Sequence, residues 1–177
     1  MNNSYKTKYL KPAEVFITDQ PYYVQTILGS CVSITMFHGK TGVAAICHGM
    51  LPTATNYSDQ KLQYKFLDYS FYELLKFYSK KNISLSELNV CVYGGADMFS
   101  VKRENKSIGR LNIEMAFQLI EKHELKLLDF NVGGYRGRKI IFNTFNGEIE
   151  IVKEKEVRDL ELIKQELIRI LKGNNGD

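Results

Sequence analysis

The sequence contains three cysteines and three histidines, and one cysteine–histidine pair has a spacing suited to nucleophilic catalysis. A cysteine needs a base or a positive neighbour to form the reactive thiolate at neutral pH, and a histidine can act as that base. Cys31 and His48 lie in neighbouring segments with strand character, residues 31–37 and 42–48. If the hairpin turns at residues 39–40, Cys31 faces His48, with Cβ atoms roughly 4.5–5.5 Å apart.

The other two cysteines are expected to be buried in the core. Cys47 precedes His48, and successive residues of a strand point to opposite faces, so Cys47 cannot share a pocket with that histidine. Cys91 lies within an apolar run. From the residues alone two interpretations of Cys31 and His48 stay open: a catalytic pair, or a packed thiol beside a hydrogen-bonded core histidine, which is the commoner case.

The two residues before Cys31 would suit a nucleophile. Gly29 and Ser30 allow the backbone to turn sharply, which would expose the sulfur. The same turn would free nearby N–H groups to stabilise an oxyanion. We therefore take Gly29 and Ser30 as candidate oxyanion or substrate-binding residues.

Apolar periodicity predicts the elements that position these residues. Strands are expected over residues 14–18, 22–28, 31–37, 42–48, 86–93, 125–132, 138–145 and 148–152. Helices are expected over residues 60–79, 107–123 and 155–171. The pattern is typical of one α/β or α+β domain, with mixed or antiparallel sheets and helices packed on the outside.

The helical stripes also predict which residues face the core. The first helix is expected to bury Leu67, Phe71, Leu74, Leu75 and Tyr78. The second, with Ser107 as its N-cap, is expected to bury Ile108, Leu111, Met115 and Leu119. Around this domain, taken as residues 13–153, we expect a flexible N-terminal segment over residues 1–12 and a C-terminal helix with a frayed tail over 154–177.

Composition excludes several classes of function. The net charge is only +4, from 24 basic and 20 acidic residues that are interspersed, so a nucleic-acid interface is not expected. The first residues lack the features of a signal peptide, and no apolar run approaches the roughly 20 residues of a membrane span. An odd number of cysteines without metal-ligand spacing indicates free thiols in the cytoplasm rather than disulfides or a metal site.

Several motifs together resemble the CheD family of chemoreceptor glutamine deamidases. They are LGSCV at residues 28–32, HGMLP at 48–52, VYGGADMF at 92–99, IGRLN at 108–112 and NVGGYRGR at 131–138. The resemblance runs over about residues 14–153 in the family's order.

The resemblance implies a cysteine hydrolase that converts receptor glutamines to glutamate through a thioester, without a metal or organic cofactor. Cys31 would be the nucleophile, His48 the base, and an upstream hydroxyl residue the third member. The family's threonine lies six residues before the cysteine in some members, and this sequence has Gln25 at that position. The nearest threonine is Thr26, five residues before the cysteine, so we assign the role to Thr26. Methyl-accepting chemotaxis receptors would be the substrates, and a CheC-like phosphatase is a possible partner.

Two other functions remain open from the sequence. The protein could be a weakly catalytic or non-catalytic regulator that binds a CheC-like phosphatase or the receptors. It could also be a thiol hydrolase that acts on small esters or amides.

Overall fold

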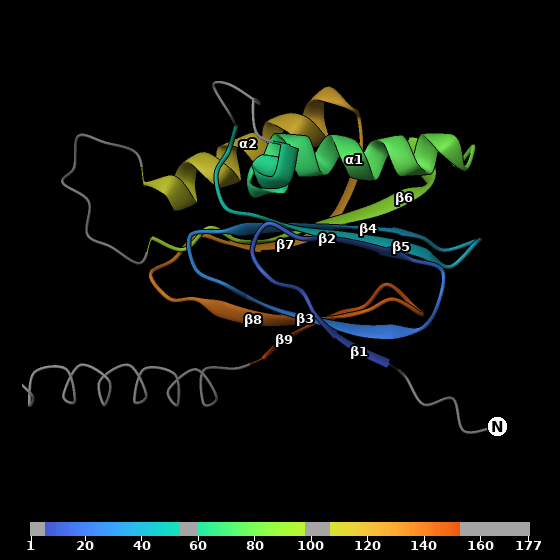
Figure 1. The fold of residues 1–177 in the computed structure, drawn as a ribbon, viewed down its shortest axis with the longest axis horizontal. Helices are drawn as coiled ribbons and strands as arrows, with labels where there is room; N and C mark the ends of the chain where they lie inside the picture. The colour runs from blue at the N-terminus through green and yellow to red at the C-terminus, as the bar shows by residue number, and fades with distance from the viewer. Residues whose placement is uncertain (1–5, 54–59, 98–106, 153–177) are drawn as a thin grey trace, which may run out of the picture.

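The structure is a computed structural model that describes residues 6–53, 60–97 and 107–152. These residues form three layers, with two helices above a five-stranded sheet and a four-stranded sheet below it (Figure 1). The mixed α+β class and the single domain predicted from the sequence are confirmed. The helix predicted over residues 155–171 and the tail after it lie outside the described residues.

The middle layer is the five-stranded sheet, which carries the hairpin predicted to hold the cysteine and the histidine. Its order is β2 (Val15–Thr18), β5 (Val43–Gly49), β4 (Val32–His38), β6 (Leu88–Gly94) and β7 (Lys126–Val132). All neighbours are antiparallel except β6 and β7, which are parallel. Strands β4 and β5 are buried along their whole length, because the helices cover one face and the second sheet covers the other.

The lower layer is the four-stranded sheet, and it contains a strand that the sequence did not predict. Its order is β1 (Lys6–Tyr9), β3 (Tyr22–Leu28), β8 (Arg138–Asn143) and β9 (Ile149–Val152). Strand β1 pairs in parallel with β3, and Leu10 directly after it is fully buried. The expectation of a flexible segment over residues 1–12 is therefore wrong for residues 6–12, and residues 1–5 lie outside the described part.

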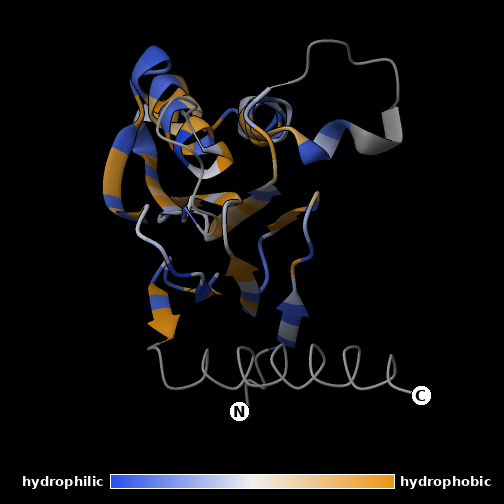
Figure 2. Ribbon diagram, turned by 90° about the vertical axis from the view of Figure 1, so that its left-hand side faces the viewer, coloured by the Kyte–Doolittle hydropathy of each residue, from blue (hydrophilic) through white to orange (hydrophobic). Residues whose placement is uncertain are grey.

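The helices cover the outer face of the five-stranded sheet, and hydrophilic and hydrophobic residues alternate around them (Figure 2). They are α1 (Leu67–Lys80) and α2 (Ile108–Lys122), with short 3-10 helices η1 (Gln60–Lys65) and η2 (Leu85–Glu87). The predicted helix over residues 60–79 thus begins as a 3-10 helix. The five residues predicted to face the core from α1 are all buried. None of the helices in the described part of the chain is both long and apolar enough to cross a membrane.

Helix α2 is rotated relative to the prediction. Its N-cap is Ser107, whose Oγ accepts a hydrogen bond from the Arg110 amide at 3.2 Å, as predicted. Ile108, however, is 42% exposed, and Gly109 and Asn112 turn inward instead. The cause is close packing at the start of the helix, since a Cβ atom on Gly109 would lie 2.6 Å from the Gly95 carbonyl oxygen.

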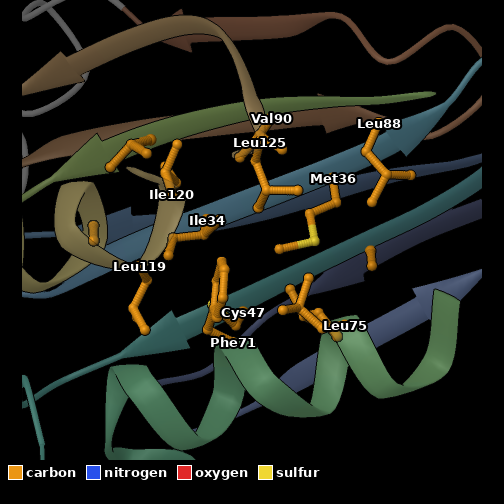
Figure 3. Packing of buried hydrophobic residues seen from close by; sticks show 14 of the residues in the cluster. Ile34, Met36, Cys47, Phe71, Leu75, Leu88, Val90, Leu119, Ile120 and Leu125 are labelled. Atoms are coloured by element: carbon orange, nitrogen blue, oxygen red, sulfur yellow. The ribbon is translucent and has the colours of Figure 1, made fainter. Parts of the chain in front are cut away.

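Two apolar clusters fill the spaces between the layers. The first lies between the helices and the five-stranded sheet, where Phe71 and Leu75 of α1 meet strand residues that include Cys47 (Figure 3). The second lies between the two sheets and includes Leu28 and Tyr93, with Cys31 packed against it. Residues of β4 and β5 alternate between the two clusters, so parity along these strands decides which space a side chain enters.

Candidate active site

The register of the β4–β5 hairpin differs from the prediction by two residues. Ser33 pairs with His48, and the last pair of the ladder is Val32 with Gly49, so Cys31 does not lie directly opposite His48. The turn occupies residues 39–42. Its last residue, Gly42, adopts a left-handed φ of +70° and donates its N–H to the His38 carbonyl at 2.9 Å, which places the turn later than expected.

A shift of two residues preserves the face of a strand, so the predicted face still holds. Ala44 and Ile46 of β5 lie in the cluster between the sheets, and His48 continues the same alternation. Cys31, the residue just before β4, packs against that same cluster. Both side chains therefore enter the space between the sheets, as diagonal rather than direct neighbours.

Thr26 of β3 reaches His48 from the opposite sheet. Its Oγ1 lies 2.8 Å from His48 Nδ1 and 2.9 Å from the Leu10 carbonyl oxygen. The carbonyl can only accept, so the hydroxyl donates its one proton to Leu10 and offers a lone pair to the imidazole. Nδ1 must then carry the ring proton, and Nε2 keeps its lone pair.

The imidazole of His48 is buried and neutral. Burial lowers the pKa of His48 from 6.5 to about 4, against the opposing effects of the Leu10 backbone and of Glu14. Nε2 is buried and has no hydrogen-bond partner among the described residues. A neutral ring with an unoccupied Nε2 lone pair can accept a proton over most of the physiological pH range.

Cys31 is partly exposed, and its thiol is protonated at rest. Burial raises the pKa of the Cys31 thiol above its ordinary value, and the backbone N–H of the same residue acts in the opposite direction. The thiol does not hydrogen-bond to His48 Nε2 in this state. Catalytic hydrogen bonds are often long in a free enzyme and shorten when substrate binds.

The segment before the thiol is held by its carbonyl groups. The Gly29 carbonyl accepts the Ala96 N–H, and the Cys31 carbonyl accepts the Gly95 N–H, each at 2.7 Å. Gly94 makes this approach possible, because a Cβ atom there would lie 2.2 Å from the Cys31 carbonyl oxygen and its φ is +109°. Apart from the contact of the Cys31 N–H with its own sulfur, the amides of Ser30 and Cys31 have no hydrogen-bond partner among the described residues, so they are available to an oxyanion.

The structure thus brings together Thr26 and His48, and places Cys31 on their side of the sheet. Cys47 and Cys91 are buried, as predicted. Gln25, the alternative to Thr26, takes part in the fold through its carbonyl, which accepts the Leu10 N–H at 2.8 Å. The sequence did not point to Leu10, because its contribution comes from the backbone.

Comparison with known proteins gives the chain a family context. The family described as CheD chemotactic sensory transduction matches residues 50–153. A probable chemoreceptor glutamine deamidase CheD 2 of Geobacter sulfurreducens is 37% identical over 141 residues, which cover 80% of this chain and 86% of the relative.

Two further relatives carry similar names. A probable chemoreceptor glutamine deamidase CheD of Maridesulfovibrio salexigens is 32% identical over 151 residues, covering 81% of this chain and 89% of that protein. Another, from Pseudomonas savastanoi pv. phaseolicola, is 32% identical over 143 residues, covering 79% and 80%. The similarity extends over most of both chains in each comparison.

Proposed function

Since the chain belongs to the CheD family, we propose that it hydrolyses glutamine side chains on methyl-accepting chemotaxis receptors to glutamate and ammonia. One observation carries the chemical part of this proposal. Thr26 holds His48 with its proton on Nδ1, which leaves Nε2 as a free base in the space that Cys31 also enters. A thiol beside a neutral imidazole suits acyl transfer from an amide.

The first half of the proposed reaction forms a thioester. His48 Nε2 takes the Cys31 thiol proton as the sulfur attacks the carboxamide carbon, because the raised pKa of the thiol disfavours a free thiolate beforehand. The amides of Ser30 and Cys31 receive the oxyanion. The protonated Nε2 then gives its proton to the departing nitrogen, and ammonia leaves.

The second half regenerates the enzyme. A water molecule gives a proton to His48 Nε2 and attacks the thioester carbon. The carbon–sulfur bond breaks, the thiolate recovers the proton from Nε2, and the product is glutamate. These steps need no metal or organic cofactor. Thr26 keeps the proton on Nδ1 throughout, since its hydroxyl continues to donate its hydrogen bond to the Leu10 carbonyl and to accept from the ring.

The place where the protein acts is part of the proposal. We place it in the cytoplasm, where its cysteines would stay reduced. All three cysteines are free thiols in the structure. A CheC-like phosphatase is a further proposed partner, and neither nucleic acid nor membrane insertion is part of the proposal.

The function is tested with a purified receptor cytoplasmic fragment. Ammonia release and conversion of particular glutamines to glutamate, followed by peptide mass spectrometry, are the expected results. A protein that binds the fragment or a CheC-like phosphatase but releases no ammonia would be a regulator rather than an enzyme. Hydrolysis confined to small esters and amides would make it a different thiol hydrolase. Either result would overturn the proposal.

A further inference from the structure

Asn112 is a fully buried polar residue on the inner face of α2, and it touches both halves of the candidate site. Its amide nitrogen donates one hydrogen to the Ser30 carbonyl and the other to the Met50 carbonyl, each at 2.9 Å. Ser30 precedes Cys31, and Met50 lies two residues after His48. One side chain therefore connects the segment of the proposed nucleophile to the strand of the proposed base.

We propose that Asn112 is a positioning residue that turns the Ser30–Cys31 peptide so that the Cys31 N–H faces the reacting carbonyl. The proposal rests on the assignment of Cys31 as nucleophile. In a planar trans peptide the C=O and N–H groups point in opposite directions. Because the Ser30 carbonyl points at Asn112 on α2, the Cys31 N–H points away from that helix.

The surroundings of the thiol agree with this orientation. The N–H of Cys31 contacts its own sulfur, and this contact lowers the pKa of the thiol. Apart from its own sulfur, this N–H has no hydrogen-bond partner among the residues that the structure describes. A donor that is fixed beside the nucleophile and is not committed to another backbone group can stabilise a tetrahedral oxyanion.

The neighbouring carbonyls are fixed in a different way. Those of Gly29 and Cys31 accept backbone N–H groups of Ala96 and Gly95, which no side-chain substitution removes. In the described part of the chain, only the central carbonyl of the three, that of Ser30, is held by a side chain. Substitution of Asn112 can therefore release this one peptide and leave its neighbours anchored.

The second polar atom of Asn112 argues against a role that only fills space. Its Oδ1 is buried and has no partner among the described residues. An unpaired buried acceptor costs roughly 1–3 kcal/mol, whereas an apolar side chain of similar shape can occupy such a site at little cost. Two directed N–H donors therefore matter here more than filling the space.

Two reagents separate oxyanion stabilisation from simple reactivity of the thiol. Acylation of Cys31 by p-nitrophenyl acetate forms a sulfur–carbon bond through a tetrahedral oxyanion and then expels p-nitrophenolate. Alkylation by iodoacetamide displaces iodide and forms no oxyanion. The rates at Cys31, measured by mass spectrometry, are compared for the wild-type chain, Asn112→Ala and Asn112→Leu.

Thr144→Val is the matched control. Thr144 is also a buried polar side chain that links two backbone groups, accepting from the Tyr22 amide and donating to the Gln20 carbonyl, each at 2.8 Å. Thr144 lies near the start of β3, whereas Thr26 lies toward the other end of that strand. The Thr144→Val variant should lower the melting temperature and leave both rates at Cys31 unchanged.

We expect the Asn112 variants to acylate about 10²-fold more slowly, the usual loss when one oxyanion donor is removed, with alkylation changed less than about threefold. Leucine fills the site if alanine proves too unstable to purify. An equal fall in both rates, or no fall in either, would overturn the proposal. Neither reagent involves a receptor, so failure of the proposed receptor substrate would leave this comparison intact.

Discussion

Acidification should destabilise the protein through His48 by an amount that follows from the burial of its ring. The unfolded chain takes up this proton near pH 6.5, and the folded protein only near pH 4, because burial lowers the pKa of His48. Between these values the unfolded state binds more protons, so the free energy of unfolding falls as the pH is lowered. The contribution is complete above pH 6.5, is lost on the way to pH 4, and falls no further below it.

The magnitude comes from the difference between the two values, 6.5 minus about 4. Each unit corresponds to about 1.36 kcal/mol, so the loss attributable to His48 is about 3 kcal/mol. Other groups also titrate over this interval. Their contributions to the free energy of unfolding cancel when wild type is compared with a variant that lacks only this ring. His48→Asn is suitable, because asparagine is neutral at every pH in the range.

The assay is urea denaturation followed by circular dichroism, from neutral pH down to about pH 4, for both proteins. The stability of wild type should fall more steeply, and the two curves should converge by about 3 kcal/mol across the interval. Parallel curves would refute the reasoning, because they would mean that His48 has an ordinary pKa in the folded state. The wild-type enzyme should correspondingly stay active below pH 6.5, where an ordinary histidine is protonated.

Two further substitutions test the surroundings of the pair. Thr26→Val should lower kcat by about 10²-fold or more, because the imidazole loses the acceptor that fixes its tautomer. Thr26→Ser keeps the hydroxyl and should retain most activity. Equal activity of the two variants in a steady-state ammonia assay would contradict this role of Thr26. Gly94→Ala should also lower kcat, by about tenfold or more, because its Cβ would press on the Cys31 carbonyl. Gly134→Ala is its control, since Gly134 also has a positive φ but has open space around it, and a comparable loss in both variants would show backbone strain alone to be responsible.

The layers of the fold were predictable because the periodicity of the chain is strong. Strands with apolar or alternating residues and the stripe on α1 indicated sheets covered by helices, and the structure agrees. Strand β1 could not be found this way, because its four residues, KTKY, are polar or amphipathic and mostly exposed. Its place depends on parallel pairing with β3, a long-range contact without a local signal.

The sequence predicted which face of the sheet Cys31 and His48 share, but not the register of the β4–β5 hairpin. Alternation alone put Cys31 and His48 on one side of the sheet, and this holds whether the turn occupies residues 39–40 or 39–42. The register depends on which glycine closes the turn, and both Gly39 and Gly42 were available. The left-handed φ of Gly42 fixes it, and a single sequence does not reveal that choice.

The groups around the pair were harder to predict, because they come from other layers. Thr26 was chosen over Gln25 because it is the threonine nearest to the expected position, and its contact with His48 crosses between the two sheets. Asn112 was overlooked because the predicted stripe on α2 ran through Ile108, which is exposed. An inward stripe through Gly109, Asn112 and Ala116 would have shown a polar residue among small ones, the signal of a buried side chain with a specific hydrogen-bonding role.

The central claim is that the Cys31 thiol performs the deamidation, and site-resolved mass spectrometry of a receptor cytoplasmic fragment tests it most directly. The fragment is incubated with wild type, Cys31→Ala and Cys47→Ala, the last removing a buried thiol on the helix-facing side of the same sheet. We predict conversion of glutamine to glutamate at the same sites with wild type and Cys47→Ala, and none with folded Cys31→Ala. Glutamate formation by Cys31→Ala at the wild-type rate would contradict the account.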